Sequence, residues 1–141
     1  MQHAYDLSGV TLTQMHFLTF QVSPMEQLRF IALATLLMQP KELKPSIILL
    51  DEPELGLHPS AITVLGAMIR TAAIDAQIII STQSPMLLDL FEPEEVIVVD
   101  RDSESTKFSR LNSADLGDWL SDYSLGELWE KNELGGKPKG S

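Results

Sequence analysis

Short apolar runs alternate with amphipathic stretches along most of the chain. Residues 47–50, 77–81 and 96–99 are largely apolar at successive positions, which is typical of parallel strands that are buried on both faces. Helical spacing at residues 59–73 and 84–90 separates these three runs. The order predicts consecutive β-α units, with parallel strands joined by right-handed crossovers. Further predicted elements are a strand or hairpin arm at 10–20, an edge strand at 107–111, and short helices at 114–121 and 125–130.

A helix is predicted to begin at Ser23. Ser23 suits the N-cap, Pro24 suits the first helical position, and Glu26 completes a capping box. A stripe of residues at helical spacing follows, consisting of Leu28, Ile31, Ala32, Thr35 and Leu36. Residues 40–45 are predicted to form a loop between this helix and the first apolar strand.

Two adjacent carboxylates, Asp51 and Glu52, follow the apolar run at 47–50, and Pro53 ends the strand because it has no N–H. The carboxyl ends of parallel strands meet at one edge of a sheet, where open α/β sheets bind ligands. The corner at residues 82–84 should lie at the same edge. An Asp there can hold Mg²⁺, and a Glu can orient or deprotonate a water. A strand that simply runs into a polar turn is the alternative interpretation.

The ungapped stretch Leu-Leu-Asp-Glu-Pro-Glu-Leu-Gly-Leu-His-Pro resembles the Walker B and D-loop segment of ABC-type ATPases. The resemblance is strongest to soluble SMC, RecF and OLD-nuclease-like AAA domains. It implies that Asp51 helps to hold the Mg²⁺ of bound ATP and that Glu52 polarises the attacking water. It also implies that the segment from Leu55 to His58 crosses a dimer interface beside the partner's nucleotide, although His58 also suits a helix cap.

The corner Ser-Thr-Gln-Ser-Pro resembles the switch segment of the same ATPases, which more often carries His. Gln83 takes the switch position, where its amide can donate to a phosphate oxygen or hold a water, but cannot titrate near neutral pH. The alternative is that Ser84 is simply the N-cap of a helix.

The segment at Ser23 resembles the family's signature motif only in part. Ser23, Glu26 and Arg29 match in register, but Pro24 and Met25 replace the two glycines whose N–H groups approach a nucleotide on the opposite subunit. A capping box explains Ser23 and Glu26 equally well, so a nucleotide contact and a purely structural role both remain open for them.

No Gly-x-x-x-x-Gly-Lys-Ser/Thr phosphate loop occurs in the sequence. The resemblance therefore implies the carboxyl-terminal portion of a three-layer, P-loop NTPase-like parallel sheet, with Walker B, D-loop and switch but without Walker A. We expect an amino-terminal strand or hairpin segment at 1–20, a partial ATPase domain at 21–134 and a flexible tail at 135–141. ATP and Mg²⁺ are expected as cofactors only when the missing amino-terminal half is supplied.

Composition narrows the expected partners and location. With 44% hydrophobic residues the chain is globular, and with no cysteine it has neither disulfides nor thiolate metal sites. A net charge of −10 argues against binding of nucleic acid by this chain alone, so any DNA contact would need another segment. No signal peptide and no apolar run of the ~20 residues that a membrane span needs is found. We therefore expect a cytoplasmic protein.

Two functions from different classes fit these features. The first is part of an ATP-hydrolysing domain that serves DNA repair or phage defence and works as a homo-oligomer or with a partner ATPase chain. The second is a non-catalytic interaction or regulatory module derived from that fold. A nuclease-linked defence protein is a weaker third possibility, resting on analogy alone. By itself the chain is expected to be inactive, because no phosphate loop positions the nucleotide.

Overall fold

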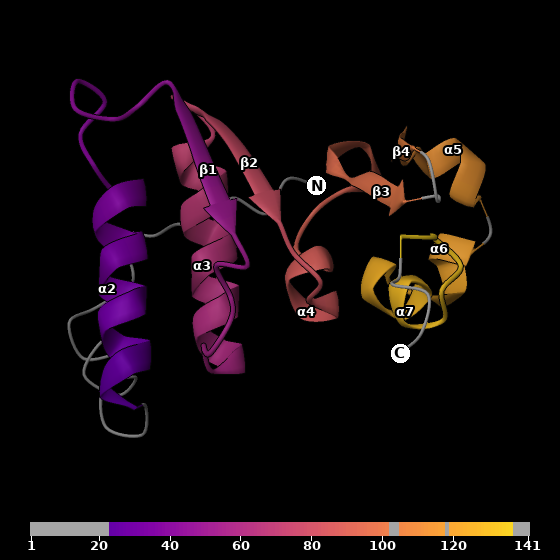
Figure 1. The fold of residues 1–141 in the computed structure, drawn as a ribbon, viewed down its shortest axis with the longest axis horizontal. Helices are drawn as coiled ribbons and strands as arrows, with labels where there is room; N and C mark the ends of the chain where they lie inside the picture. Colours follow the sequence, from indigo (N-terminus) through magenta and orange to yellow (C-terminus); the bar gives the residue numbers. More distant parts are fainter. Residues whose placement is uncertain (1–22, 102–104, 118, 137–141) are drawn as a thin grey trace. The chain divides into compact units, whose positions relative to one another are not determined.

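The computed structural model describes residues 23–101, 105–117 and 119–136 (Figure 1). The chain divides into two compact units, of which the first extends to Thr82 and the second begins at Gln83. The predicted strand at 10–20 lies outside the described residues. Among the described helices, none combines the length and the apolar character that crossing a membrane requires.

The first unit is a β-α-β arrangement preceded by a helix. In chain order its elements are α2 (Pro24–Leu37), β1 (Ile47–Asp51), α3 (Pro59–Ala72) and β2 (Gln77–Ser81). β1 and β2 pair in parallel, with Ile47 opposite Gln77 and Asp51 opposite Ser81. This confirms the predicted parallel pairing of these two strands. α3 is the crossover and lies behind the strands in Figure 1, and α2 runs beside it.

The core of the first unit forms between the strands and α3. Ile48 and Leu50 are buried on β1, and Leu37 is the buried residue of α2. α3 contributes the largest share of buried side chains, namely Ala61, Ile62, Leu65, Met68, Ile69 and Ala72. The predicted stripe on α2 is not the packed face, since Leu28 and Ile31 are 64% and 55% exposed.

The prediction that β1 is buried on both faces was wrong for the described residues. Ile47 and Leu49 alternate with the buried positions and are 56% and 71% exposed, and Ile79 on β2 is 50% exposed. In a parallel pair, side chains at paired positions share a face. These three side chains therefore form one apolar surface, here called the open sheet face, on the side opposite the buried residues Ile48 and Leu50.

The second unit contains α4 (Pro85–Leu88), η2 (Pro93–Glu95), β3 (Ile97–Arg101), β4 (Thr106–Arg110), α5 (Ser113–Leu116), α6 (Trp119–Asp122) and α7 (Leu125–Glu130). β3 and β4 pair in antiparallel fashion and form a separate sheet. A strand at the predicted place is therefore confirmed, whereas its parallel pairing with the first two strands is not. The connection between β3 and β4 is short, which allows an antiparallel hairpin and no parallel crossover. The mixed α/β class is confirmed, and a three-layer parallel sheet is not.

Carboxylates that accept backbone N–H groups stabilise the second unit. Asp89 accepts from Gly126 at 2.6 Å, where a side chain on Gly126 would collide with the Pro85 carbonyl. Glu94 accepts from both the hydroxyl and the N–H of Ser113, and these hydrogen bonds hold the pKa of Glu94 below its usual value. Such contacts fix the short helices, which are too short to be stable by themselves.

The predicted limits of three carboxyl-terminal elements differ in detail from the structure. The helix expected at 84–90 ends at Leu88, and the helix expected at 114–121 is two helices, α5 and α6, with Gly117 at φ +45° after the first. The predicted tail begins with Gly135 and Gly136, and the latter donates its N–H to Asp100 at 2.6 Å. The rest of the tail lies outside the described residues.

We expect the open sheet face to cause self-association of the chain. Leu49→Thr combined with Ile79→Thr should lower the average molar mass of the species in solution at a chain concentration of tens of micromolar, because it removes exposed apolar area. The unfolding free energy should change by only about 0.5 kcal/mol per site. Light scattering with chemical denaturation measures both effects. As a control, Ile48→Thr on the buried face should cost about 2 kcal/mol instead. A parental chain that is strictly monomeric would contradict this expectation.

Candidate functional site

The candidate site lies in the first unit, at the carboxyl ends of β1 and β2. Asp51 is the last residue of β1 and pairs with Ser81, whose hydroxyl donates to Asp51 Oδ1. Both side chains are exposed and lie on the same side of the strands as Leu49 and Ile79. Asp51 therefore stands at the end of the open sheet face, with one carboxylate oxygen already engaged by a hydroxyl.

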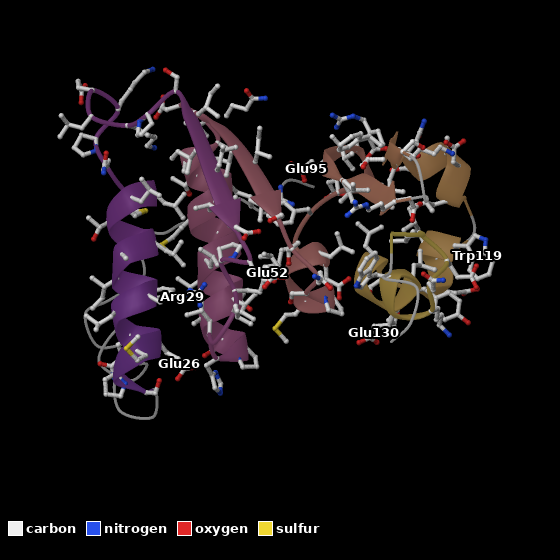
Figure 2. The ribbon with its side chains drawn as sticks, in the orientation of Figure 1. Glu26, Arg29, Glu52, Glu95, Trp119 and Glu130 are labelled. Carbon is white, nitrogen blue, oxygen red and sulfur yellow. The ribbon has the colours of Figure 1, made fainter. Side chains whose placement is uncertain are left out.

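Glu52 turns the chain out of the strand. Its φ is +41°, a left-handed backbone conformation that residues other than glycine rarely adopt. Its N–H donates to the Ser81 carbonyl at 2.9 Å, and its own carbonyl accepts from Leu55 at 3.1 Å. The backbone of Glu52 is thus held on both sides. Strained conformations of this kind cluster at functional sites, and here the strain falls on a residue that the sequence singles out (Figure 2).

Glu54 is a site residue that the sequence analysis missed. Its side chain is only 9% exposed, and its Oε1 accepts from the Thr82 hydroxyl at 2.5 Å. Within the described residues Glu54 Oε2 is buried without a hydrogen-bond partner. Nothing in the sequence identifies this pairing, because Glu54 and Thr82 come from different loops. Only the parallel register of β1 and β2 brings the two residues together.

The turn after β1 is connected to both helices of the first unit. Arg29, labelled on α2 in Figure 2, donates from Nη1 to the carbonyl of Leu55 at 2.9 Å. Gly56 adopts φ +76°, which allows the tight turn. His58 is the N-cap of α3, since its Nδ1 accepts from the Ser60 N–H at 3.2 Å. The capping role predicted for His58 is confirmed.

Ser23 and Glu26 form the predicted capping box at the start of α2. The Ser23 N–H donates to the Glu26 carboxylate at 2.8 Å, and the Glu26 N–H donates to the Ser23 hydroxyl at 3.3 Å. The functional groups of both side chains are therefore engaged in local contacts. A nucleotide contact by either residue stays a prediction.

Gln83 follows Thr82 directly and is the first residue of the second unit, so the site of the first unit ends at Thr82. The Gln83 side chain is exposed. Ser84 caps α4 by accepting from the Leu87 N–H at 3.3 Å, as the sequence predicts. The structure thus brings Asp51, Glu52 and Thr82 to one edge, whereas the place of Gln83 relative to the carboxylates stays a prediction.

The oxygen atoms at this edge suit a hard cation but do not complete a metal site. Carboxylate and hydroxyl oxygens are the ligands that Mg²⁺ prefers, and it usually keeps one or two protein carboxylates together with waters and phosphate oxygens. Among the described residues, no group of three or more His, Cys, Asp or Glu side chains is placed to hold a metal ion. The role of Asp51 as a magnesium ligand therefore stays a prediction.

Comparison with protein families supports an ATPase-like domain. Residues 27–89 are similar to the family described as "AAA domain, putative AbiEii toxin, Type IV TA system". The matched segment covers somewhat less than half of the chain and runs from the first turns of α2 to the end of α4. It includes Asp51, Glu52, His58 and Gln83 and leaves Ser23 and Glu26 outside. A search of curated proteins finds no match. The segment is thus similar to an AAA-type, P-loop ATPase-like domain.

The left-handed backbone at Glu52 predicts an unusual response to glycine. Glu52→Gly should leave the unfolding free energy unchanged or raise it by up to about 1 kcal/mol, because glycine adopts positive φ without a steric penalty. Asp51→Gly, within the strand, should lower it by about 1 kcal/mol. Urea denaturation measures both. Equal destabilisation by the two changes would show that Glu52 is not held in the left-handed region.

The N-cap role of His58 gives a second prediction about stability. His58→Ala should lower the unfolding free energy by about 1 kcal/mol, because the N–H groups at the start of α3 lose their acceptor. His58→Asn should retain most of the stability, since Asn is among the best N-cap residues. Thermal and urea denaturation of the three proteins measure the difference, and a His58→Asn protein as unstable as His58→Ala would refute the capping role.

Proposed function

We propose that this chain carries the Walker B, D-loop and switch part of a soluble ABC-type ATPase domain. One observation supports this most directly. Asp51 and Glu52 stand at the carboxyl end of a parallel strand, within the segment that is similar to an AAA domain. The phosphate loop, which the sequence lacks, would come from another segment. The three-layer sheet of P-loop ATPases would then be completed by that segment on the open sheet face.

Each residue of the candidate site has a proposed task. Asp51 would be a ligand of Mg²⁺, with the Ser81 hydroxyl fixing its other oxygen. Glu52 would orient the attacking water and receive its proton, and its backbone is already fixed by the hydrogen bond to the Ser81 carbonyl. When bound, Mg²⁺ would neutralise charge on the phosphates of ATP. Gln83 would donate from its amide to a phosphate oxygen.

Nucleotide contacts across a dimer are a further part of the proposal. Ser23 and Glu26 at the start of α2, and His58 after the turn, would face the nucleotide of a second copy or of a partner ATPase chain. Arg29 supports this grouping, because its contact with the Leu55 carbonyl connects α2 to the turn that precedes His58. Closure of two domains around ATP would then move α2 and the turn together.

The proposed cellular role rests on the resemblance in sequence. We propose a cytoplasmic ATPase that serves phage defence or DNA repair, as the resemblance to OLD-like and RecF-like ATPases implies. The description of the matched family names a putative toxin of a type IV TA system and neither of these processes. The net charge of −10 makes direct DNA binding by this chain unfavourable, so DNA contacts would use another segment.

A non-catalytic interaction module is the second candidate, and the start of α2 favours it. Pro24 has no N–H to offer a phosphate, and the Ser23 and Glu26 side chains are engaged in the capping box. In this case the fold is kept, the open sheet face binds another ATPase, and the chain regulates that ATPase without hydrolysing ATP.

The isolated 141-residue chain should not hydrolyse ATP, because magnesium ligands without a phosphate loop leave the nucleotide unpositioned. In a complex reconstituted with an amino-terminal ATPase half, two substitutions should separate binding from chemistry. Asp51→Ala should weaken Mg²⁺-dependent nucleotide binding by at least about tenfold. Glu52→Gln should bind normally and hydrolyse at least about 100-fold more slowly, because an amide cannot act as a base.

Nucleotide titration and single-turnover hydrolysis measure these effects. Asn112→Ala, which removes a helix cap in the second unit, is the matched control and should leave both quantities unchanged. Hydrolysis by Glu52→Gln at the parental rate would reject the catalytic assignment. ATP-independent binding of the partner half, with no hydrolysis by the parental complex, would favour the interaction module.

A further inference from the structure

Glu54 is a buried carboxylate with a single hydrogen-bond partner. Its side chain is 9% exposed, Oε1 accepts from Thr82, and Oε2 meets no donor within the described residues. A carboxylate withdrawn from water is unfavourable unless its oxygens are hydrogen-bonded. A second carboxylate at the same edge, Asp51, is exposed and carries no such cost. The burial of Glu54 therefore calls for an explanation beyond the formation of a turn.

Glu54 and Thr82 form a second contact between the two strand ends, next to that of Asp51 and Ser81. Ser81 bonds to Asp51 on the exposed side, and the next residue along, Thr82, bonds to the buried Glu54. Between these two contacts the Glu52 N–H donates to the Ser81 carbonyl at 2.9 Å. The backbone of Glu52, at φ +41°, is thus flanked by two carboxylate–hydroxyl hydrogen bonds. Loss of either should loosen it.

We propose that Glu54 is a positioning residue of the site. Through Thr82 it holds Glu52 and the backbone before Gln83 in place. Through Oε2 it accepts a hydrogen bond from an N–H or O–H donor of the segment that completes the ATPase. The contact that Glu54 makes on assembly would in this way fix the position of Glu52, which orients the water. This inference rests on the proposed function, because the effect on chemistry passes through Glu52.

A Glu54→Gln substitution can distinguish the hydrogen bond of Oε1 from that of Oε2. A Gln at this position keeps an oxygen that can accept from Thr82, but it presents N–H donors where Glu54 has Oε2. An incoming donor would then meet another donor. Glu54→Gln should therefore preserve the local structure of the isolated chain and still impair the assembled ATPase. A residue that only stabilises the fold would show no such separation.

The first arm of the test uses the isolated chain and amide hydrogen exchange at Glu52. Thr82→Val and Glu54→Ala should each speed this exchange about tenfold, the equivalent of one lost hydrogen bond. Thr82→Ser and Glu54→Gln should keep it near the parental rate. Thr71→Val is the matched control, because it removes a threonine hydroxyl bonded only within α3. Glu52 exchange that is unchanged by Thr82→Val would overturn the proposal.

The second arm uses the reconstituted complex and steady-state ATP hydrolysis. Glu54→Gln should lower kcat about ten- to hundredfold while KM for ATP stays within about twofold, since positioning is lost and nucleotide binding is not. Parental kcat in Glu54→Gln, in a complex where Glu52→Gln abolishes turnover, would overturn this inference alone. A complex whose turnover is unaffected by Glu52→Gln would instead reject the proposed function, and the positioning role would fall with it.

Discussion

The parallel pairing of β1 with β2 is the constraint on which the candidate site depends. The register sets Asp51 opposite Ser81 and thereby brings together residues about thirty positions apart in the sequence. Two carboxylate–hydroxyl hydrogen bonds and one backbone bond then close the ends of the strands. None of these contacts could form if the register moved by one residue, because the side chains of one strand would then face the opposite side.

The same pairing leaves an apolar surface on one side of the sheet. Ile48 and Leu50 are buried, while Leu49 and Ile79 remain exposed on the open sheet face. Parallel sheets normally have both faces covered, so this face is suited to contact another segment. Because Asp51 stands at the end of this face, the segment that covers it would also approach the carboxylate. The same segment would then bury the open sheet face and complete the site at Asp51.

Strain and burial fall on neighbouring residues in the turn after β1. Glu52 has a left-handed backbone and Glu54 a buried carboxylate, and each is unfavourable by itself. The contacts from Ser81, Thr82 and Arg29 hold this turn against both strands and helix α2. A turn that served only to reverse the chain would not need either feature. Both features agree with the positioning role that we propose for this turn.

The local elements of this protein could be predicted from neighbouring residues alone. The capping box at Ser23, the cap at Ser84, the strands at 47–51 and 77–81 and the helix between them follow from side-chain chemistry and short-range periodicity, which need only neighbouring residues. The positions of Asp51 and Glu52 at a strand end could be predicted for the same reason. The family-like segment around them was also recognisable, since its residues are contiguous.

Features that depend on residues distant in the sequence could not be predicted, because they follow from packing. The exposure of Leu49 depends on which faces of the sheet are covered. A strand with one buried face and a strand with two can have the same apolar sequence. β3 pairs with β4 in an antiparallel hairpin, because the short connection between these two strands allows no crossover. Glu54 became a site residue only through its contact with Thr82. Periodicity reports a residue's local environment, whereas burial and hydrogen-bond partners are set by packing.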